Sequence, residues 1–187
     1  SGLDLTGADF SGMDSRGANF HKTLLECANH SGCQLDGANL TQAVLARADL
    51  QNASLRQCLL ENASLALAQC RQTDFHGAHF TETELTGALF EACDFSHARI
   101  SNVLLRETGF SQCVFQSSTL DNCVFMELTL PQPDFSRAVM TKTSFIKCEL
   151  LRAVFAHAQL DSCSWVESQL EHADFANAML ITCAVAS

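Results

Sequence analysis

The stretch ANLTQAVLARADLQNASL, residues 38–55, places Leu at every fifth position and Ala two positions before each of these four Leu residues. The same spacing continues over the chain, and all 13 Phe residues lie at positions divisible by five. A five-residue period matches neither the roughly 3.6-residue period of an α-helix nor the two-residue period of an ordinary strand. The chain must therefore turn once in each repeat.

Two sets of positions define the repeat. We call the positions divisible by five the central column and the positions two residues before them the small column. Asp or Asn often stands directly before the central column, as at Asp9 and Asn39, and Gly often stands two places after it, as at Gly7 and Gly37. Asx side chains bond nearby backbone groups and Gly tolerates unusual dihedral angles, so the sequence predicts a turn after each central residue.

Length and charge limit the classes of function. The 187 residues are enough for one domain with a sizeable core. The formal net charge of −10 argues against unassisted binding to nucleic acid or anionic lipid. No apolar run is long enough to predict a membrane helix. Because Ser1 stands where Met would be expected, we expect residues 1–187 to form a single domain of a longer protein.

Four segments carry a family resemblance: ADFSG (8–12), ANFHK (18–22), ANLTQ (38–42) and ADLQN (48–52) resemble the A-(D/N)-L-x-x unit of pentapeptide-repeat proteins. The resemblance covers essentially the entire chain. It implies an all-β fold, a right-handed quadrilateral parallel β-helix of about nine coils with four repeats in each coil. Both columns would then point inward, and the other three positions of each repeat would face outward.

Outward residues beside the central Leu column include an unusual number of apolar side chains. Residues twenty apart would stack in this fold, so these side chains should merge into a stripe, and contiguous apolar surface usually marks a contact site. Alternatively, turns or a further segment of the protein cover these side chains. The candidate protein-binding residues are Leu24, Val44, Leu67, Leu104, Val124, Met126, Ile146 and Val166.

Ten Cys residues suggest disulfides or a metal site at first reading. Eight of them replace Ala in the small column, where a free Cys serves as a small buried hydrophobe. Stacked pairs such as Cys93 and Cys113 would hold their Cβ atoms near the coil spacing, wider than a disulfide prefers. We therefore expect reduced thiols and a cytoplasmic protein, with no metal and no cofactor.

Several residues depart from the pattern. His30 occupies a central position, where it predicts either a kink or a locally satisfied core His, with a functional role as the alternative. His76 and His97 should approach each other from adjacent coils as a solvated pair. Leu128 and Pro133 are oversized for the small column, and Pro lacks a backbone donor, so this Pro-containing stretch predicts a bulge or bend, or a partner-binding feature.

Catalytic motifs are missing from the sequence. It contains no nucleophile elbow, no phosphate-binding loop and no Cys-His pair with an orienting group, and the carboxylates are spread along the expected rod. The sequence therefore predicts a protein that is not an enzyme and that acts through its outward positions as a protein-binding scaffold.

The resemblance suggests two kinds of partner. The segments SGLDLTGADFSGMDSRGANF (1–20) and FSRAVMTKTSFIKCELLRAVF (135–155) look like the repeat region of bacterial type VI secretion accessory proteins. That resemblance implies an adaptor that handles a secretion effector or spike protein. End-to-end pairing of two rods into a homodimer is left open by the repeat pattern, because open β-helix ends invite stacking.

The alternative is a resemblance to the quinolone-resistance pentapeptide proteins, acidic rods that imitate DNA and bind DNA gyrase or topoisomerase IV. The length and net charge suit this alternative. However, sorting the residues by side gives similar acidic excesses on all four sides, so no side concentrates charge as a phosphate mimic. The unbroken repeat also leaves no projecting loop, and the tail ANAMLITCAVAS (176–187) lacks the expected dimerising helix.

Overall fold

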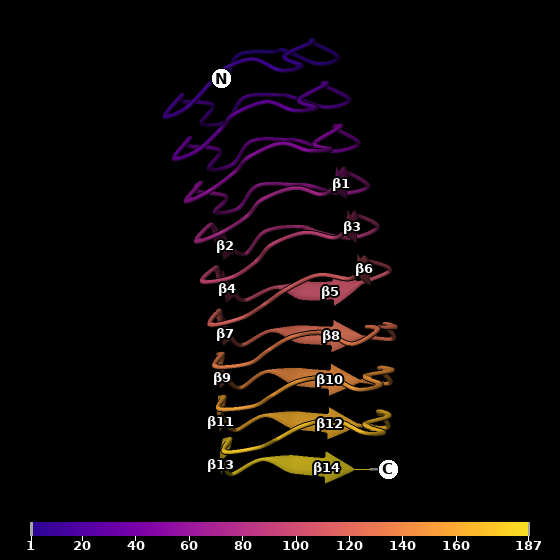
Figure 1. The fold of residues 1–187 in the computed structure, drawn as a ribbon. Coiled ribbons are helices and arrows are strands. Elements are labelled where there is room, and N and C mark those ends of the chain that lie inside the picture. The colour runs from indigo at the N-terminus through magenta and orange to yellow at the C-terminus, as the bar shows by residue number, and fades with distance from the viewer. Residues whose placement is uncertain (1, 187) are drawn as a thin grey trace.

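A computed structural model describes residues 2–186 of the chain. Its coils stack along one axis, with the N-terminus at one end and the C-terminus at the other (Figure 1). The described residues are all-β, and none of them forms a helix with the length and hydropathy of a membrane span. The predicted class, a parallel β-helix, is confirmed.

Backbone hydrogen bonds join each coil to the next. Residues twenty apart pair in parallel, from Asp4 with Leu24 at one end to Ser164 with Ala184 at the other. Most central amides donate to the next coil, as Leu25 N does to the Val44 carbonyl at 2.8 Å. Because all these bonds run between coils, each coil depends on its neighbours for stability.

Fourteen three-residue strands form three sheets within residues 2–186, and each sheet occupies its own side of the rod. One sheet contains β1 (Gln69–Arg71), β3 (Leu89–Glu91) and β6 (Gly109–Ser111). The second contains β5 (Leu104–Arg106), β8 (Val124–Met126), β10 (Ser144–Ile146), β12 (Ser164–Val166) and β14 (Ala184–Ala186). The third contains β2 (His79–Thr81), β4 (Arg99–Ser101), β7 (Thr119–Asp121), β9 (Val139–Thr141), β11 (Gln159–Asp161) and β13 (Met179–Ile181).

Isolated bridges complete the square section. The fourth side is paired by single bridges such as Asp74 with Asp94, rather than by strands. Regular strands cover six successive turns in the largest sheet, fewer than the predicted count of about nine coils. Before Gln69, single bridges such as Asn39 with Leu59 maintain the same twenty-residue spacing.

The two inward columns form one continuous core. Leu35 in the central column and Ala38 in the small column are both fully buried. On the fourth side, six Phe side chains stack with ring centroids 4.8 to 5.3 Å apart, which confirms the aromatic ladder expected from the spacing. Such pairs each contribute about 0.5–1.5 kcal/mol beyond the burial of their area. The ladder consists of Phe75, Phe95, Phe115, Phe135, Phe155 and Phe175.

The turns have the predicted chemistry. The residue two places after each central position has a positive φ, whether it is Gly, as at Gly77 (66°), or another residue, as at Ala92 (53°). Asx side chains before the central column accept from the turn, as Asp9 Oδ1 does from Ser11 N at 2.9 Å. The Asp and Asn residues of the repeat therefore serve mainly as turn-stabilising groups.

Polar residues in the small column have a hydrogen-bond partner that the sequence did not reveal. Most of their side chains donate to the carbonyl of the central residue 23 positions earlier, as Thr73 Oγ1 does to Leu50 (2.7 Å) and Cys58 Sγ does to Leu35 (2.8 Å). This shared acceptor explains why Thr and Cys can both replace Ala inside the rod. All ten cysteines are free in the structure.

Some coil-to-coil bonds are missing where the small column carries a large side chain. Elsewhere the amide after a small-column residue donates to the coil before, as Ser54 N does to the Cys33 carbonyl at 2.9 Å. Within the described chain, the amides of Leu104, Thr129 and Asp134 form no such bond. These three residues directly follow Val103, Leu128 and Pro133, which stack on Thr83, Thr108 and Cys113 in the twenty-residue register.

The bulge predicted at residues 128–133 is therefore confirmed, and two cavities open there. The larger, of about 430 Å³, is lined by Ser111, Gln112, Cys113, Val114, Pro131, Gln132 and Asp134. The step between β6 and the coil below it is visibly wider than the neighbouring steps (Figure 1). On the adjacent side the ladder stays closed, because Phe115 N still donates to the Asp134 carbonyl at 2.8 Å.

The expected cause of the bulge was wrong. Pro131 and Pro133 occupy repeat positions whose amides usually donate within their own coil. One repeat later, Ser136 N donates to Asp134 Oδ1 and Ala138 N donates to the Phe135 carbonyl. A missing proline donor at these places breaks no coil-to-coil bond. The volume of the Leu128 and Pro133 side chains, rather than their hydrogen-bonding capacity, separates the coils.

Candidate protein-binding surface

Five of the eight predicted binding residues lie together on the five-stranded sheet. Leu104 is in register with Val124 on one side of the central column, and Met126, Ile146 and Val166 follow one another on the other side. We call these five residues the apolar sheet face. They point outward because the strand alternation turns the central residues between them, such as Phe145, into the core.

Exposure differs along the apolar sheet face. The Leu104 side chain is 44% exposed, whereas Val124, Met126, Ile146 and Val166 are half-buried because neighbours twenty residues away cover part of each. Two serines, Ser144 and Ser164, interrupt the column of Val124, and their hydroxyls bond to each other at 2.9 Å. The other column is apolar without a break from Met126 to Val166.

The remaining predicted residues do not join this surface, so the expectation of one continuous stripe was wrong. Leu24 and Val44 pair with each other on the same side of the rod. Ser64 and Glu84 follow them in the ladder, and Ser64 Oγ donates to Glu84 Oε2 at 2.9 Å. This polar pair separates Leu24 and Val44 from the apolar sheet face.

Leu67 has a structural role at a corner. It is 48% exposed, and its Cδ2 atom lies 2.5 Å from the place where a Cβ atom on Gly87 would be. The side chain therefore packs over the backbone of Gly87 in the next coil. Its exposure alone suggested a contact site, but the structure assigns it an intramolecular contact.

Charged residues border the apolar sheet face on one side. Glu107, Glu127 and Glu167 are exposed at the corner beside the column of Met126. Lys147 stands among them, with Nζ 3.9 Å from Glu167 Oε2. In the described part of the chain, Glu107 and Glu127 form no ion pair. With Arg106, which is exposed directly before Glu107, two basic residues accompany these three carboxylates.

The opposite border is polar and also carries the exposed carboxylates of Asp121 and Asp161. Asn122 Nδ2 donates to Asn102 Oδ1 at 2.8 Å, and Ser162 Oγ lies 3.1 Å from Thr182 Oγ1. Lys142 is exposed in the same column. The apolar sheet face thus has charged and polar residues along both borders.

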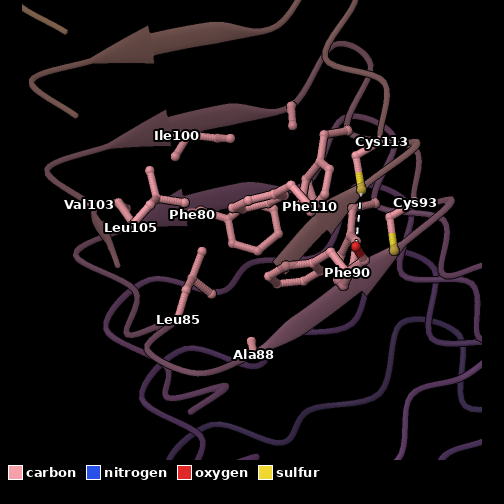
Figure 2. Packing of buried hydrophobic residues seen from close by; sticks show 14 of the residues in the cluster. Phe80, Leu85, Ala88, Phe90, Cys93, Ile100, Val103, Leu105, Phe110 and Cys113 are labelled. Atoms are coloured by element: carbon pink, nitrogen blue, oxygen red, sulfur yellow. Dashed lines mark hydrogen bonds between the residues drawn. The ribbon is translucent and has the colours of Figure 1, made fainter. Parts of the chain in front are cut away.

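A second apolar feature was missed from the sequence. A cavity of about 330 Å³ opens beside β3 and β6, lined in part by Leu89, Phe90, Phe110 and Pro131. Leu89 is 50% exposed, and its Cδ2 atom lies 3.2 Å from where a Cβ on Gly109 would be. Figure 2 shows Phe90 and Phe110 next to Cys113, whose thiol donates to the Phe90 carbonyl at 3.5 Å. Gly109, the only Gly directly before a central residue, was the available signal.

The His76–His97 pair lies where the spacing predicted it, whereas the expectation that His30 is locally satisfied was wrong. The rings of His76 and His97 have centroids 5.0 Å apart at the surface. No group of three His, Cys, Asp or Glu side chains among residues 2–186 is arranged to hold a metal ion. His30 lies fully buried in the core, and neither of its ring nitrogens has a hydrogen-bond partner.

Comparison with known proteins places the chain in a family. The family model described as Pentapeptide repeats (8 copies) matches residues 4–42, 24–62, 43–81 and 68–109, more than half of the chain. The chain belongs to the pentapeptide repeat family. Its twenty-residue coils and inward columns are the structural expression of that repeat.

Solved structures of pentapeptide repeat proteins share the fold. HetL from the cyanobacterium Nostoc sp. strain PCC 7120 is 26% identical and superposes with a TM-score of 0.69, covering 95% of this chain and 82% of HetL. A trypsin-treated form of QnrB1, a plasmid-mediated fluoroquinolone resistance protein, is 14% identical with a TM-score of 0.59, covering 99% and 92%. A search of curated proteins gave no match.

Proposed function

We propose that this pentapeptide repeat protein is a non-catalytic scaffold that binds another protein through the apolar sheet face. The observation that carries the proposal is the unbroken outward column of Met126, Ile146 and Val166, with Leu104 and Val124 beside it on the same sheet. Covering such side chains contributes roughly 25 cal/mol for each Å² of apolar area removed from water. A flat, apolar surface on a rigid ladder suits a partner that docks without reordering the rod.

The setting we propose is a bacterial type VI secretion system, in which the rod would act as an accessory or adaptor domain for an effector or spike protein. Support for this setting is the sequence resemblance of the repeat segments. HetL is described as involved in the regulation of heterocyst differentiation, so a family member of similar size can serve a regulatory role. The ten free thiols support a reducing compartment such as the cytoplasm.

A second candidate is binding to DNA gyrase as a DNA mimic. The excess of 21 acidic over 11 basic residues favours this candidate. Five ion pairs, however, place basic groups beside Asp14, Glu26, Asp74, Glu91 and Glu167. These pairs reduce the charge that a phosphate mimic would need to present.

The experiment that tests the scaffold uses a photo-crosslinking residue at position 146, or at position 116 on the opposite side of the rod as a control. Purified effector and spike proteins, and purified gyrase, are the candidate partners. We expect crosslinks from position 146 and their loss in Ile146→Glu with the crosslinker at position 124. The matched Gln116→Glu variant, also at an exposed outward position, should leave them unchanged.

A supercoiling assay separates the two candidates. Inhibition of gyrase by the wild-type protein, undiminished in Ile146→Glu, would replace the apolar scaffold with the DNA mimic. Crosslinks that form equally from positions 116 and 146 would remove the apolar sheet face as the binding surface.

A further inference from the structure

We infer that the rod is hinged within residues 104–134 and bends there about one of its four corners. Two steps between successive coils lack their coil-to-coil hydrogen bonds on one side each, and we call them the open steps. They lie on two adjacent sides of the rod, while the other two sides remain connected. The inference does not rest on the proposed function, because it concerns the backbone of the rod and not a partner.

The first open step lies between Glu84 and Leu104, on the side of the five-stranded sheet. In the described part of the chain no bridge joins these two residues, and the amide of Leu85 donates to no carbonyl of the next coil. The five-stranded sheet begins only at β5, although single bridges pair the same side from Asp4 to Glu84. Val103 is the large small-column residue at this step.

The second open step lies one coil further along, between Gly109 and Thr129. The three-stranded sheet ends there at β6, and within residues 2–186 the amides of Phe110 and Gln112 donate to no carbonyl of the next coil. The cavities of about 430 and 330 Å³ both open at this step. Because β6 follows β5 directly in the chain, the two open steps lie on adjacent sides of the square section.

The two remaining sides connect the halves of the rod. The six-stranded sheet runs without a break from β2 to β13. On the fourth side Phe115 stacks on both Phe95 and Phe135 with ring centroids 4.9 Å apart. The rings of Phe115 and Phe135 are inclined by 23°, against 6 to 12° at the other steps of the ladder, so the ladder fans out beside the second open step.

The corner between these two sides is the axis of the hinge. His97, Ser117 and Arg137 follow one another at this corner, and each of their amides donates to the next coil at 2.9 to 3.0 Å. Both open sides lie across the rod from it. Bending about this corner therefore breaks no hydrogen bond, whereas bending in another direction stretches paired strands. Motion concentrates where few backbone bonds have to open.

The hinge changes the orientation of the apolar sheet face relative to the N-terminal coils. All five residues of this face, from Leu104 to Val166, follow the first open step. Leu24 and Val44 precede it on the same side of the rod. The apolar sheet face therefore turns as one body, and the angle between it and the Leu24–Val44 pair is set by the hinge.

Distances between spin labels at corner positions test the hinge. Pulsed electron paramagnetic resonance measures them, with labels on a genetically encoded azido amino acid because the chain contains ten cysteines. Positions 92 and 152 lie on either side of the second open step, and positions 97 and 157 have the same separation along the hinge axis; all four are exposed. We expect the distance distribution of the first pair to be at least about twofold wider than that of the second.

Two double variants locate the effect. Leu128→Ala with Pro133→Ala restores the usual small residue at the second open step, so it should shorten the mean distance from 92 to 152 and remove at least about half of the excess width. Leu59→Ala with Leu151→Ala removes volume from exposed outward positions and should leave both distributions unchanged.

The wild-type comparison is decisive by itself. Equal widths for the two pairs would overturn the hinge, whether or not the double variants fold. An unchanged distribution from 92 to 152 in the folded Leu128→Ala, Pro133→Ala variant would overturn it as well. Neither result bears on crosslinking from position 146, which tests the binding surface separately.

Discussion

His30 lies flat against Phe10 inside the rod, with ring centroids 4.8 Å apart and ring planes inclined by 5°. Phe20 meets the same imidazole edge-on at 6.2 Å. Burial among these rings lowers the pKa of His30 to about 4. A neutral imidazole therefore substitutes for the Leu or Phe found at most central positions, at the cost of two ring nitrogens without partners.

This arrangement predicts acid sensitivity of the N-terminal coils. Below pH 6.5 the unfolded chain protonates His30 and the folded chain does not, so the free energy of unfolding should fall as the pH drops from about 6.5 to about 4. The expected loss is about 3 kcal/mol over this window. Urea unfolding at several pH values measures it.

Two variants test whether His30 causes this pH dependence. His30→Leu should raise stability and remove the dependence on pH in that window, whereas His21→Gln, at an exposed position, should keep it. Turn hydrogen bonds lower the pKa of Asp4 and Asp9 below 3.8, so their contribution to acid unfolding begins at lower pH. An unchanged slope between pH 6.5 and 4.5 in His30→Leu would contradict the assignment.

The turn residues with positive φ predict that two substitutions change the stability in opposite directions. Gly77 has a φ of 66°, and an added Cβ would meet Gln57 Cγ at 3.4 Å, an ordinary contact. Gly77→Ala should therefore cost about 1 kcal/mol through backbone strain alone. Ala92→Gly, at a φ of 53° and an exposed position, should relieve a comparable strain. Thermal unfolding of both variants is the measurement, and destabilisation by Ala92→Gly would show that chain entropy outweighs strain.

The oversized small-column residues predict local differences in amide exchange. The amide of Thr129, which lacks its coil-to-coil bond, should exchange faster than that of Glu149, which donates to the Leu128 carbonyl at 2.9 Å. In Leu128→Ala the coils should close, and the Thr129 amide should become more protected. Hydrogen exchange followed by NMR resolves these amides.

Leu130→Ala is the matched control for that experiment. Leu130 is fully buried in the central column, so its truncation should destabilise the chain by about 2–5 kcal/mol. It should not slow exchange at Thr129, because Leu128 still separates the coils. Greater protection of Thr129 in both variants would remove the link to the small column.

Thiol accessibility gives a fourth prediction. Cys27 is exposed at a turn, whereas burial raises the pKa of Cys58 to about 12 and that of Cys123 to about 11. One thiol should therefore react rapidly with a disulfide reagent in the folded protein, followed more slowly by the half-buried Cys183. Cys27→Ser should abolish the fast phase, and Cys58→Ser should leave it unchanged. A fast phase that survives Cys27→Ser would contradict the assigned burial.

Much of the fold could be read from the period alone. Once Leu40 and Ala38 are placed in their columns, the twenty-residue register assigns every residue to the inside or the outside. The same register placed Ser64 and Glu84 between the two halves of the predicted stripe. The prediction of one continuous stripe is wrong because it grouped apolar residues that lie on either side of this polar pair.

Other features depend on volumes and distances that a period does not contain. The repeat pattern does not mark Val103 as oversized, although the amide of Leu104 lacks the same coil-to-coil hydrogen bond as the amide of Thr129. The acceptor of the Cys58 thiol, a carbonyl one coil away, follows from the close approach of the coils and not from residue type.

Each large small-column residue separates its coil from the preceding coil alone. Val124 N still donates to the Val103 carbonyl at 3.0 Å, and Glu149 N to that of Leu128 at 2.9 Å. A single such residue therefore opens the rod at one step and on one side. Moving one Leu by five positions along the small column would move the opening to the next side of the rod. The inward small column therefore decides where the coils separate, independently of the side chains on the surface.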